Sequence, residues 1–160
     1  MADGVTRART TLMWLTVAVA WGSMFYATAK TQEFITIVGA SLARSLPPEA
    51  EYRITRVENL QEPPTVRTGG RFHEAGNRQR IEWQQAGQRV VVEWEVIRGK
   101  GLLIRPSGEP IFVRAVESKR APQQGMTLHM RRMLYPLGYY LILRDSGGET
   151  LGVWELLWHT

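Results

Sequence analysis

The sequence contains no cysteine. This absence excludes a disulfide scaffold, a thiolate zinc site, a cysteine-ligated iron–sulfur cluster and a cysteine nucleophile. Aspartate is also scarce, because only two of the 15 acidic residues are Asp, whereas 17 of the 20 basic residues are Arg. The common nucleophile and metal chemistries therefore have few residues on which to rest.

The three histidines do not supply the missing chemistry. His73, His129 and His159 form none of the HxH, HxxxH or HExxH spacings that bind a metal from one element. The sequence also lacks a P-loop, a dinucleotide-binding fingerprint and a GxSxG nucleophile motif. We therefore predict a protein that is not an enzyme and has no metal and no cofactor, with a membrane-anchored enzyme of unrecognised type as an alternative.

The net charge of +5 is modest for a chain of 160 residues. Residues 1–30 carry three basic residues and one acidic residue, so the rest has 17 basic against 14 acidic residues, or +3. A nucleic-acid-binding domain normally concentrates a larger basic excess on one face. We expect no nucleic-acid partner.

Charge is absent from residues 10–29, which read TTLMWLTVAVAWGSMFYATA. Twenty helical residues span roughly 30 Å, the thickness of the hydrocarbon core of a bilayer. Aromatic residues of the kind favoured near membrane interfaces lie in this run: Trp14, Trp21, Phe25 and Tyr26. We predict an N-terminal tail over 1–9 and a single transmembrane helix over 10–29, in the bacterial inner membrane.

The same segment has the outline of a secretory signal peptide. Arg7 and Arg9 precede the apolar run, and Ala27-Thr28-Ala29 is a small-x-small cleavage sequence. An uncleaved anchor is our prediction, and cleavage is the alternative. The two arginines beside the span favour a cytoplasmic tail and a domain on the periplasmic side.

Residues 30–46 continue the helical pattern. Large apolar residues such as Phe34, Ile35 and Val38 recur at helical spacing, and Pro47-Pro48 ends the pattern. We predict an amphipathic helical connector whose apolar side packs on the following domain. The alternative is a contact with a partner subunit or the lipid surface, for which Phe34 is a candidate.

Residues 47–160 favour β-strands, and the clearest unit is the hairpin RQRIEWQQAGQRVVVEWEV. With Ala86-Gly87 as a two-residue turn, apolar residues face one another on one side and opposite charges on the other. The predicted pairs are Ile81 with Val92, Trp83 with Val90, Arg80 with Glu93 and Arg78 with Glu95. A slip by one residue would scramble both faces, so this register is strongly specified.

Further strands are predicted on either side of this hairpin. They cover residues 51–57, 66–73, 102–105 and 111–116, whereas 127–134 fit a strand or a short helix equally. Six to eight strands with turns at short spacing predict a small antiparallel β-sandwich or barrel.

The C-terminal segment YYLILRDSGGETLGVWELLW predicts a last hairpin around the loop Asp145–Gly148. The predicted pairs are Arg144 with Glu149, Ile142 with Leu151 and Tyr140 with Val153. Both faces of this hairpin are apolar, which predicts burial on two sides. Its aromatic residues are interpreted as core or as partner contacts: Tyr139, Tyr140, Trp154 and Trp158.

These patterns together predict a mainly β protein with an N-terminal transmembrane helix, a connector and a β-rich domain over 47–160. The function that fits is a non-catalytic accessory or assembly subunit that stabilises a larger membrane protein complex, for example a respiratory or photosynthetic one. Its partners would be the lipid bilayer and other subunits. The alternative is an exported periplasmic β-barrel that binds an apolar ligand after cleavage of the signal peptide.

Overall fold

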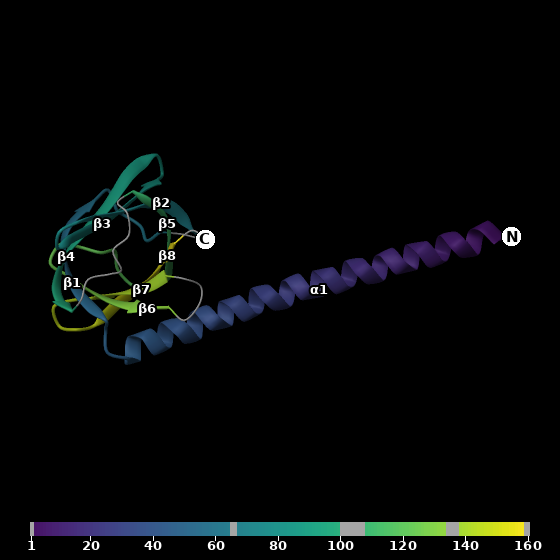
Figure 1. The fold of residues 1–160 in the computed structure, drawn as a ribbon, viewed down its shortest axis with the longest axis horizontal. Coiled ribbons are helices and arrows are strands. Elements are labelled where there is room, and N and C mark those ends of the chain that lie inside the picture. Colours follow the sequence, from purple (N-terminus) through teal and green to yellow (C-terminus); the bar gives the residue numbers. More distant parts are fainter. Residues whose placement is uncertain (1, 65–66, 100–107, 134–137, 159–160) are drawn as a thin grey trace. The chain divides into compact units, whose positions relative to one another are not determined.

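The computed structural model describes residues 2–64, 67–99, 108–133 and 138–158, with side chains from Met13 onward except that of Phe25. The chain divides into two compact units, Met1–Val38 and Gly39–Thr160. One helix, α1 (Ala2–Ser45), runs through the first unit and into the second (Figure 1). The second unit also contains eight strands.

The strands form a closed antiparallel barrel in the order β1-β4-β3-β2-β5-β8-β7-β6, and β6 pairs with β1 to close it (Figure 1). Their bounds are β1 Ala50–Glu58, β2 Thr68–Ala75, β3 Arg78–Gln85, β4 Gln88–Gly99, β5 Glu109–Ser118, β6 Thr127–Arg132, β7 Gly138–Arg144 and β8 Thr150–Trp158. The predicted sandwich or barrel is therefore a barrel. Closure pairs every strand on both sides and leaves no open sheet edge.

Aromatic side chains fill the interior of the barrel. Tyr52 packs edge-on against Trp94 with ring centroids 6.3 Å apart, and Phe72 packs in the same way against Trp158 at 5.7 Å. Edge-to-face contacts of this kind stabilise aromatic pairs beyond their buried area. The interior is thus a packed hydrophobic core with aliphatic residues such as Ile81 between the rings.

The predicted register of the first hairpin is confirmed in β3 and β4. Ile81 pairs with Val92 and Trp83 with Val90, and all four side chains are buried in the barrel. The turn residues Ala86 and Gly87 have φ angles of 50° and 76°. Two successive positive φ angles define the type I′ turn that matches the twist of paired strands.

The predicted register of the last hairpin is wrong by two residues. Ile142 pairs with Val153 and Tyr140 with Glu155, instead of with Leu151 and Val153. The first residue of this shift arises at the loop, because Arg144 pairs with Thr150 and not with Glu149. The bulge between Leu143 and Arg144 shifts the register by a second residue. A shift of two preserves the faces of a strand, so the prediction that this hairpin is buried on both sides is confirmed.

The other predicted strands are found where the structure describes the chain. Residues 51–57 lie in β1, residues 111–116 in β5, and most of 66–73 in β2. The ambiguous segment 127–134 is a strand over β6, because Leu128 and Met130 alternate into the core. The predicted strand 102–105 and residue 66 lie outside the described residues.

Residues 10–29 are helical, as predicted, and α1 ends two residues before Pro47. Within the described part of the chain, however, no helix combines the length and the apolar character that crossing a membrane requires. The prediction of a transmembrane helix over 10–29 is corrected accordingly. Hydroxyl-bearing residues and one glycine dilute the segment: Thr10, Thr11, Thr16, Gly22, Ser23 and Thr28.

Candidate functional site

Large apolar side chains on α1 are exposed to solvent. Trp14 is 70% exposed, Trp21 63%, Tyr26 69% and Phe34 66%. They are accompanied by other exposed residues: Met13, Leu15, Val17, Val19, Met24, Ile35, Ile37 and Val38. A helix that is apolar on every side is normally covered by other protein or by lipid. The side chain of Phe25, also predicted as a contact, lies outside the described part.

Several polar groups of this helix surface are satisfied within the helix. The hydroxyls of Ser23, Thr28 and Thr31 each donate a hydrogen bond, 2.7–2.8 Å long, to the carbonyl oxygen four residues earlier. Lys30 and Glu33 form an ion pair at 3.0 Å. Because these groups already have partners, burying this surface against apolar groups leaves few hydrogen bonds unmade.

The last turns of α1 pack on the outer face of the barrel through small residues. Ala40 and Ala43 are buried against Tyr140, Ile142 and Val153 of β7 and β8. Gly39 has no space for a side chain, since an added carbon would lie 2.3 Å from the Tyr140 hydroxyl oxygen. The predicted packing of the connector on the domain is found, but small residues make it and not the large apolar ones.

The aromatic residues predicted as contacts in the last hairpin divide between two locations. Tyr139, Trp154 and Trp158 belong to the core inside the barrel. Tyr140 points outward and lies beneath the end of α1. None of the four is more than 5% exposed, so the exposed residues among the predicted contacts that the structure describes all lie on α1.

A row of polar residues crosses the otherwise apolar outer face of three strands. Arg114 of β5 pairs with Glu155 of β8, which in turn is opposite Tyr140 of β7. Glu155 is 1% exposed and forms an ion pair with Arg114. Burial and the Glu155 carboxylate raise the pKa of Tyr140, with Arg114 acting in the opposite direction. This row places a charged pair on the outer face of the barrel, beside Tyr140.

Arginines also hold the C-terminal end of α1. Arg44 forms an ion pair with Glu117, and its carbonyl oxygen accepts a hydrogen bond from Arg144 at 3.5 Å. Arg131 donates to the carbonyl oxygen of Pro47. Cations near a helix C-terminus are favourable because the last carbonyls there lack partners. These contacts fix the end of α1 on the barrel.

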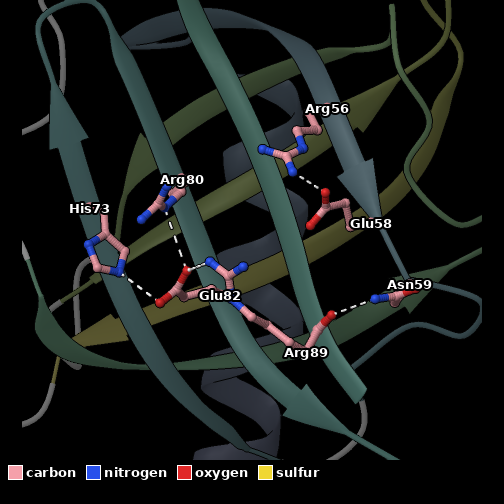
Figure 2. Close-up of polar contacts among 7 residues, drawn as sticks. All are labelled: Arg56, Glu58, Asn59, His73, Arg80, Glu82 and Arg89. Carbon is pink, nitrogen blue, oxygen red and sulfur yellow. Dashed lines mark hydrogen bonds and ion pairs between the residues drawn. The ribbon is translucent and has the colours of Figure 1, made fainter.

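The opposite side of the barrel carries a charged network centred on Glu82 (Figure 2). Glu82 on β3 accepts from Arg89 at 2.6 Å, lies 3.1 Å from the Nε2 atom of His73 and forms an ion pair with Arg80 at 3.6 Å. The side chains come from β2, β3 and β4 and meet on the outer surface. Arg80 faces Glu93 across the hairpin, as predicted, and its guanidinium forms an ion pair with Glu82 of its own strand.

Partial burial alone would raise the pKa of Glu82, but hydrogen bonds from Arg89 and His73 outweigh burial and lower it. A carboxylate held ionised by cationic neighbours is a weak general base. Two shallow hollows of about 270 and 230 Å³ flank it, the first beside His73 and Arg78, the second beside Arg71 and Arg89. The network therefore has the character of a structural surface cluster.

Replacing Glu82 with Gln is expected to lower the free energy of unfolding by about 0.5–1 kcal/mol at pH 7, because the cluster is partly exposed. Its folded-state pKa lies below the ordinary 4.5. The stabilisation by the ionised Glu82 carboxylate is therefore fully present above pH 4.5, and it is lost as the pH falls through the lower folded-state pKa. Urea unfolding at pH 7 and near pH 3 checks this, with Glu62→Gln as the control. An unchanged difference between the two pH values would contradict the expectation.

Other chemistry has little support among the described residues, where no group of three or more His, Asp or Glu side chains is placed to hold a metal ion. Asp145 serves the last turn, since its Oδ1 accepts from the backbone amides of Gly147 and Glu149. Comparison with protein families, with curated proteins and with solved structures finds no match for this chain.

Sequence reasoning missed the buried pair of Arg114 and Glu155 and the packing of small residues of α1 on the barrel. A signal for one was present, since Glu155 is a lone charge in the apolar run LGVWELLW, and a buried charge requires a partner. The other signal was the spacing of Gly39 and Ala43 on one face of the helix. Neither signal identifies its partner strand, because pairing of β5 with β8 depends on the closure of the barrel.

Proposed function

We propose that this chain is a non-catalytic accessory subunit of a larger membrane protein complex and stabilises that complex through its N-terminal helix. The exposed apolar surface of α1 carries the proposal. Its partner would be an apolar helical surface of another subunit, and its barrel would lie on the periplasmic side.

Three features support this function. The surface of α1 between Met13 and Val38 combines large apolar side chains, internally satisfied hydroxyls and one neutralised ion pair. Such a surface is suited to helix–helix packing in apolar surroundings, where hydroxyl and small residues allow close approach. The end of α1 is also fixed to the barrel, so that the helix is a continuous part of a folded subunit.

The exported carrier of an apolar ligand is less well supported. A carrier barrel needs an internal chamber, whereas Trp83, Trp94 and Trp158 contribute to a packed interior here. A ligand would have to displace core side chains at a cost of several kcal/mol.

The subunit proposal predicts the migration of the full chain on a native gel after extraction with a mild detergent. The native protein is expected to run with a complex several times heavier than 18.2 kDa. A Leu15→Asp, Val19→Asp variant should leave that complex, since it places two charges in an apolar contact. An Arg120→Asp variant, changed in an exposed loop, should remain. Migration of the unmodified chain alone would overturn the proposal.

Retention of residues 1–29 in the native protein is a separate prediction. A subunit that binds through α1 must keep this segment, so mass spectrometry of the native protein is expected to detect residues 1–29 joined to the rest of the chain. A mass lacking residues 1–29 would show cleavage after Ala29 and remove most of the proposed contact surface.

A further inference from the structure

One histidine lies beside the contacts that hold the end of α1 on the barrel. His129 is on the outer face of β6, because Leu128 and Met130 on either side of it point into the core. Its side chain is 15% exposed, and its Nδ1 atom lies 3.9 Å from a carboxylate oxygen of Glu51 on β1. Imidazole is the side chain that ordinarily changes its charge between pH 5 and 8. A change of charge at this position would therefore act on the end of α1.

The two arginines that bind the chain where α1 ends both border His129. Arg131 follows His129 by two residues on the same face of β6, and Arg144 of β7 lies at the diagonal position across the strand pair. Neighbours in these positions lie about 7 Å apart at the backbone, within reach of long side chains. Arg131 donates to the carbonyl oxygen of Pro47, and Arg144 to that of Arg44 at 3.5 Å. We call residues 44–49 the attachment segment.

The described surroundings of His129 carry more positive than negative charge. The charged and titratable groups that face it are Arg44 of α1, Glu49 of the link to β1, Glu51 and Arg53 of β1, Arg131 of β6, and Tyr140 and Arg144 of β7. Four of these are arginines and two are glutamates. Arg98 of β4 lies opposite Glu51 across the other side of β1. A proton on His129 would thus add a positive charge to a group that already has an excess.

The folded protein favours the neutral ring. Burial lowers the pKa of His129, the charge of Arg144 lowers it further, and the Glu51 carboxylate acts in the opposite direction. A histidine with a folded-state pKa below the ordinary 6.5 leaves the fold fully stable above pH 6.5. Stability then falls as the pH drops from 6.5 toward the folded-state pKa, because the released ring binds the proton more readily.

We propose that protonation of His129 weakens the attachment of the end of α1, so that the attachment segment is released from the barrel in mildly acidic solution. The imidazolium repels Arg131 and Arg144, and both arginines reduce this repulsion by moving into water and giving up their carbonyl acceptors. At neutral pH the uncharged ring lets both contacts form. The proposal goes beyond the accessory function, because it makes the attachment of the contact helix depend on pH.

Amide hydrogen exchange of the full chain in mild detergent, measured from pH 7.5 to pH 5.5, tests this release. The amides of Leu46 and Glu49 report on the attachment segment, since they donate to the carbonyl oxygens of Leu42 and Met130. After correction for the intrinsic pH dependence of exchange, their protection is expected to fall at least about threefold over this range. The range stays above the ordinary pKa of glutamate, about 4.3, so histidine is the side chain that changes its charge. Amides of the β3–β4 hairpin should keep their protection.

Three variants assign the effect to His129. His129→Gln cannot take up a proton, so its protection should be the same at both ends of the range. Glu51→Gln removes the carboxylate that favours the imidazolium, so the loss of protection should move to lower pH. His73→Gln, changed in the network around Glu82, is the matched control and should respond like the unmodified chain.

The pattern of protection decides the proposal. A loss confined to the attachment segment and absent from His129→Gln supports it. No loss in the unmodified chain, a loss that persists in His129→Gln, or an equal loss in the β3–β4 hairpin overturns it. If His129→Gln does not fold, Glu51→Gln decides: a midpoint at lower pH supports the proposal, and an unchanged midpoint overturns it.

Discussion

Replacing Trp94 with Ala is expected to lower the free energy of unfolding by about 3–5 kcal/mol. Trp94 is fully buried in the barrel and packs edge-on against Tyr52. Its indole nitrogen donates a hydrogen bond to the side-chain oxygen of Gln79 at 3.0 Å. The substitution therefore creates a cavity and also leaves the buried amide of Gln79 without its partner, which adds to the loss.

Urea unfolding of the full chain, followed by the fluorescence of the remaining tryptophans, measures this effect. Trp14→Ala is the matched control, because Trp14 is 70% exposed on α1 and its truncation leaves the barrel core intact. We expect a change within about 0.5 kcal/mol for the control. Equal effects of the two substitutions would contradict the assignment of Trp94 to the core.

The β3–β4 hairpin shows how much of this fold can be predicted from the sequence. The two-residue turn at Ala86-Gly87 fixes the pairing, and every partner along the two strands then follows by counting. Local turn geometry and two-fold alternation act together there, so no information from distant segments is needed. The strand order β5-β8-β7-β6 has no such local signal, because it depends on closure of the barrel.

The end of α1 shows why the candidate surface was only partly predicted. Sequence periodicity favours large apolar residues as contacts, and it predicts that residues such as Phe34 and Ile35 face a partner or the domain. The barrel instead receives Gly39, Ala40 and Ala43, since only small residues let the helix approach Tyr140 closely. The hydroxyl bonds that satisfy Thr28 and Thr31 depend on the helical conformation and are not coded as a motif.

The other large expected effect is at the buried ion pair of the outer face. Arg114→Leu should lower the free energy of unfolding by about 3–5 kcal/mol, because it leaves the charge of Glu155 buried without its partner. Glu155 is 1% exposed, and its Oε1 atom has no hydrogen bond among the described residues, so Arg114 provides its main compensation. Urea unfolding at pH 7 measures the loss.

The double variant Arg114→Leu, Glu155→Leu separates the charge from the packing. Replacing a buried ion pair with apolar residues is often neutral or stabilising, so the double variant should recover most of the stability that Arg114→Leu loses. The exposed pair Arg56 and Glu58 on β1 is the control, since Arg56→Leu there should cost less than about 1 kcal/mol. If the double variant is as unstable as the single one, the loss comes from altered packing and not from the unpaired charge of Glu155. Recovery would instead show that the unpaired charge of Glu155 causes the loss, and that the ion pair adds little net stability over apolar side chains.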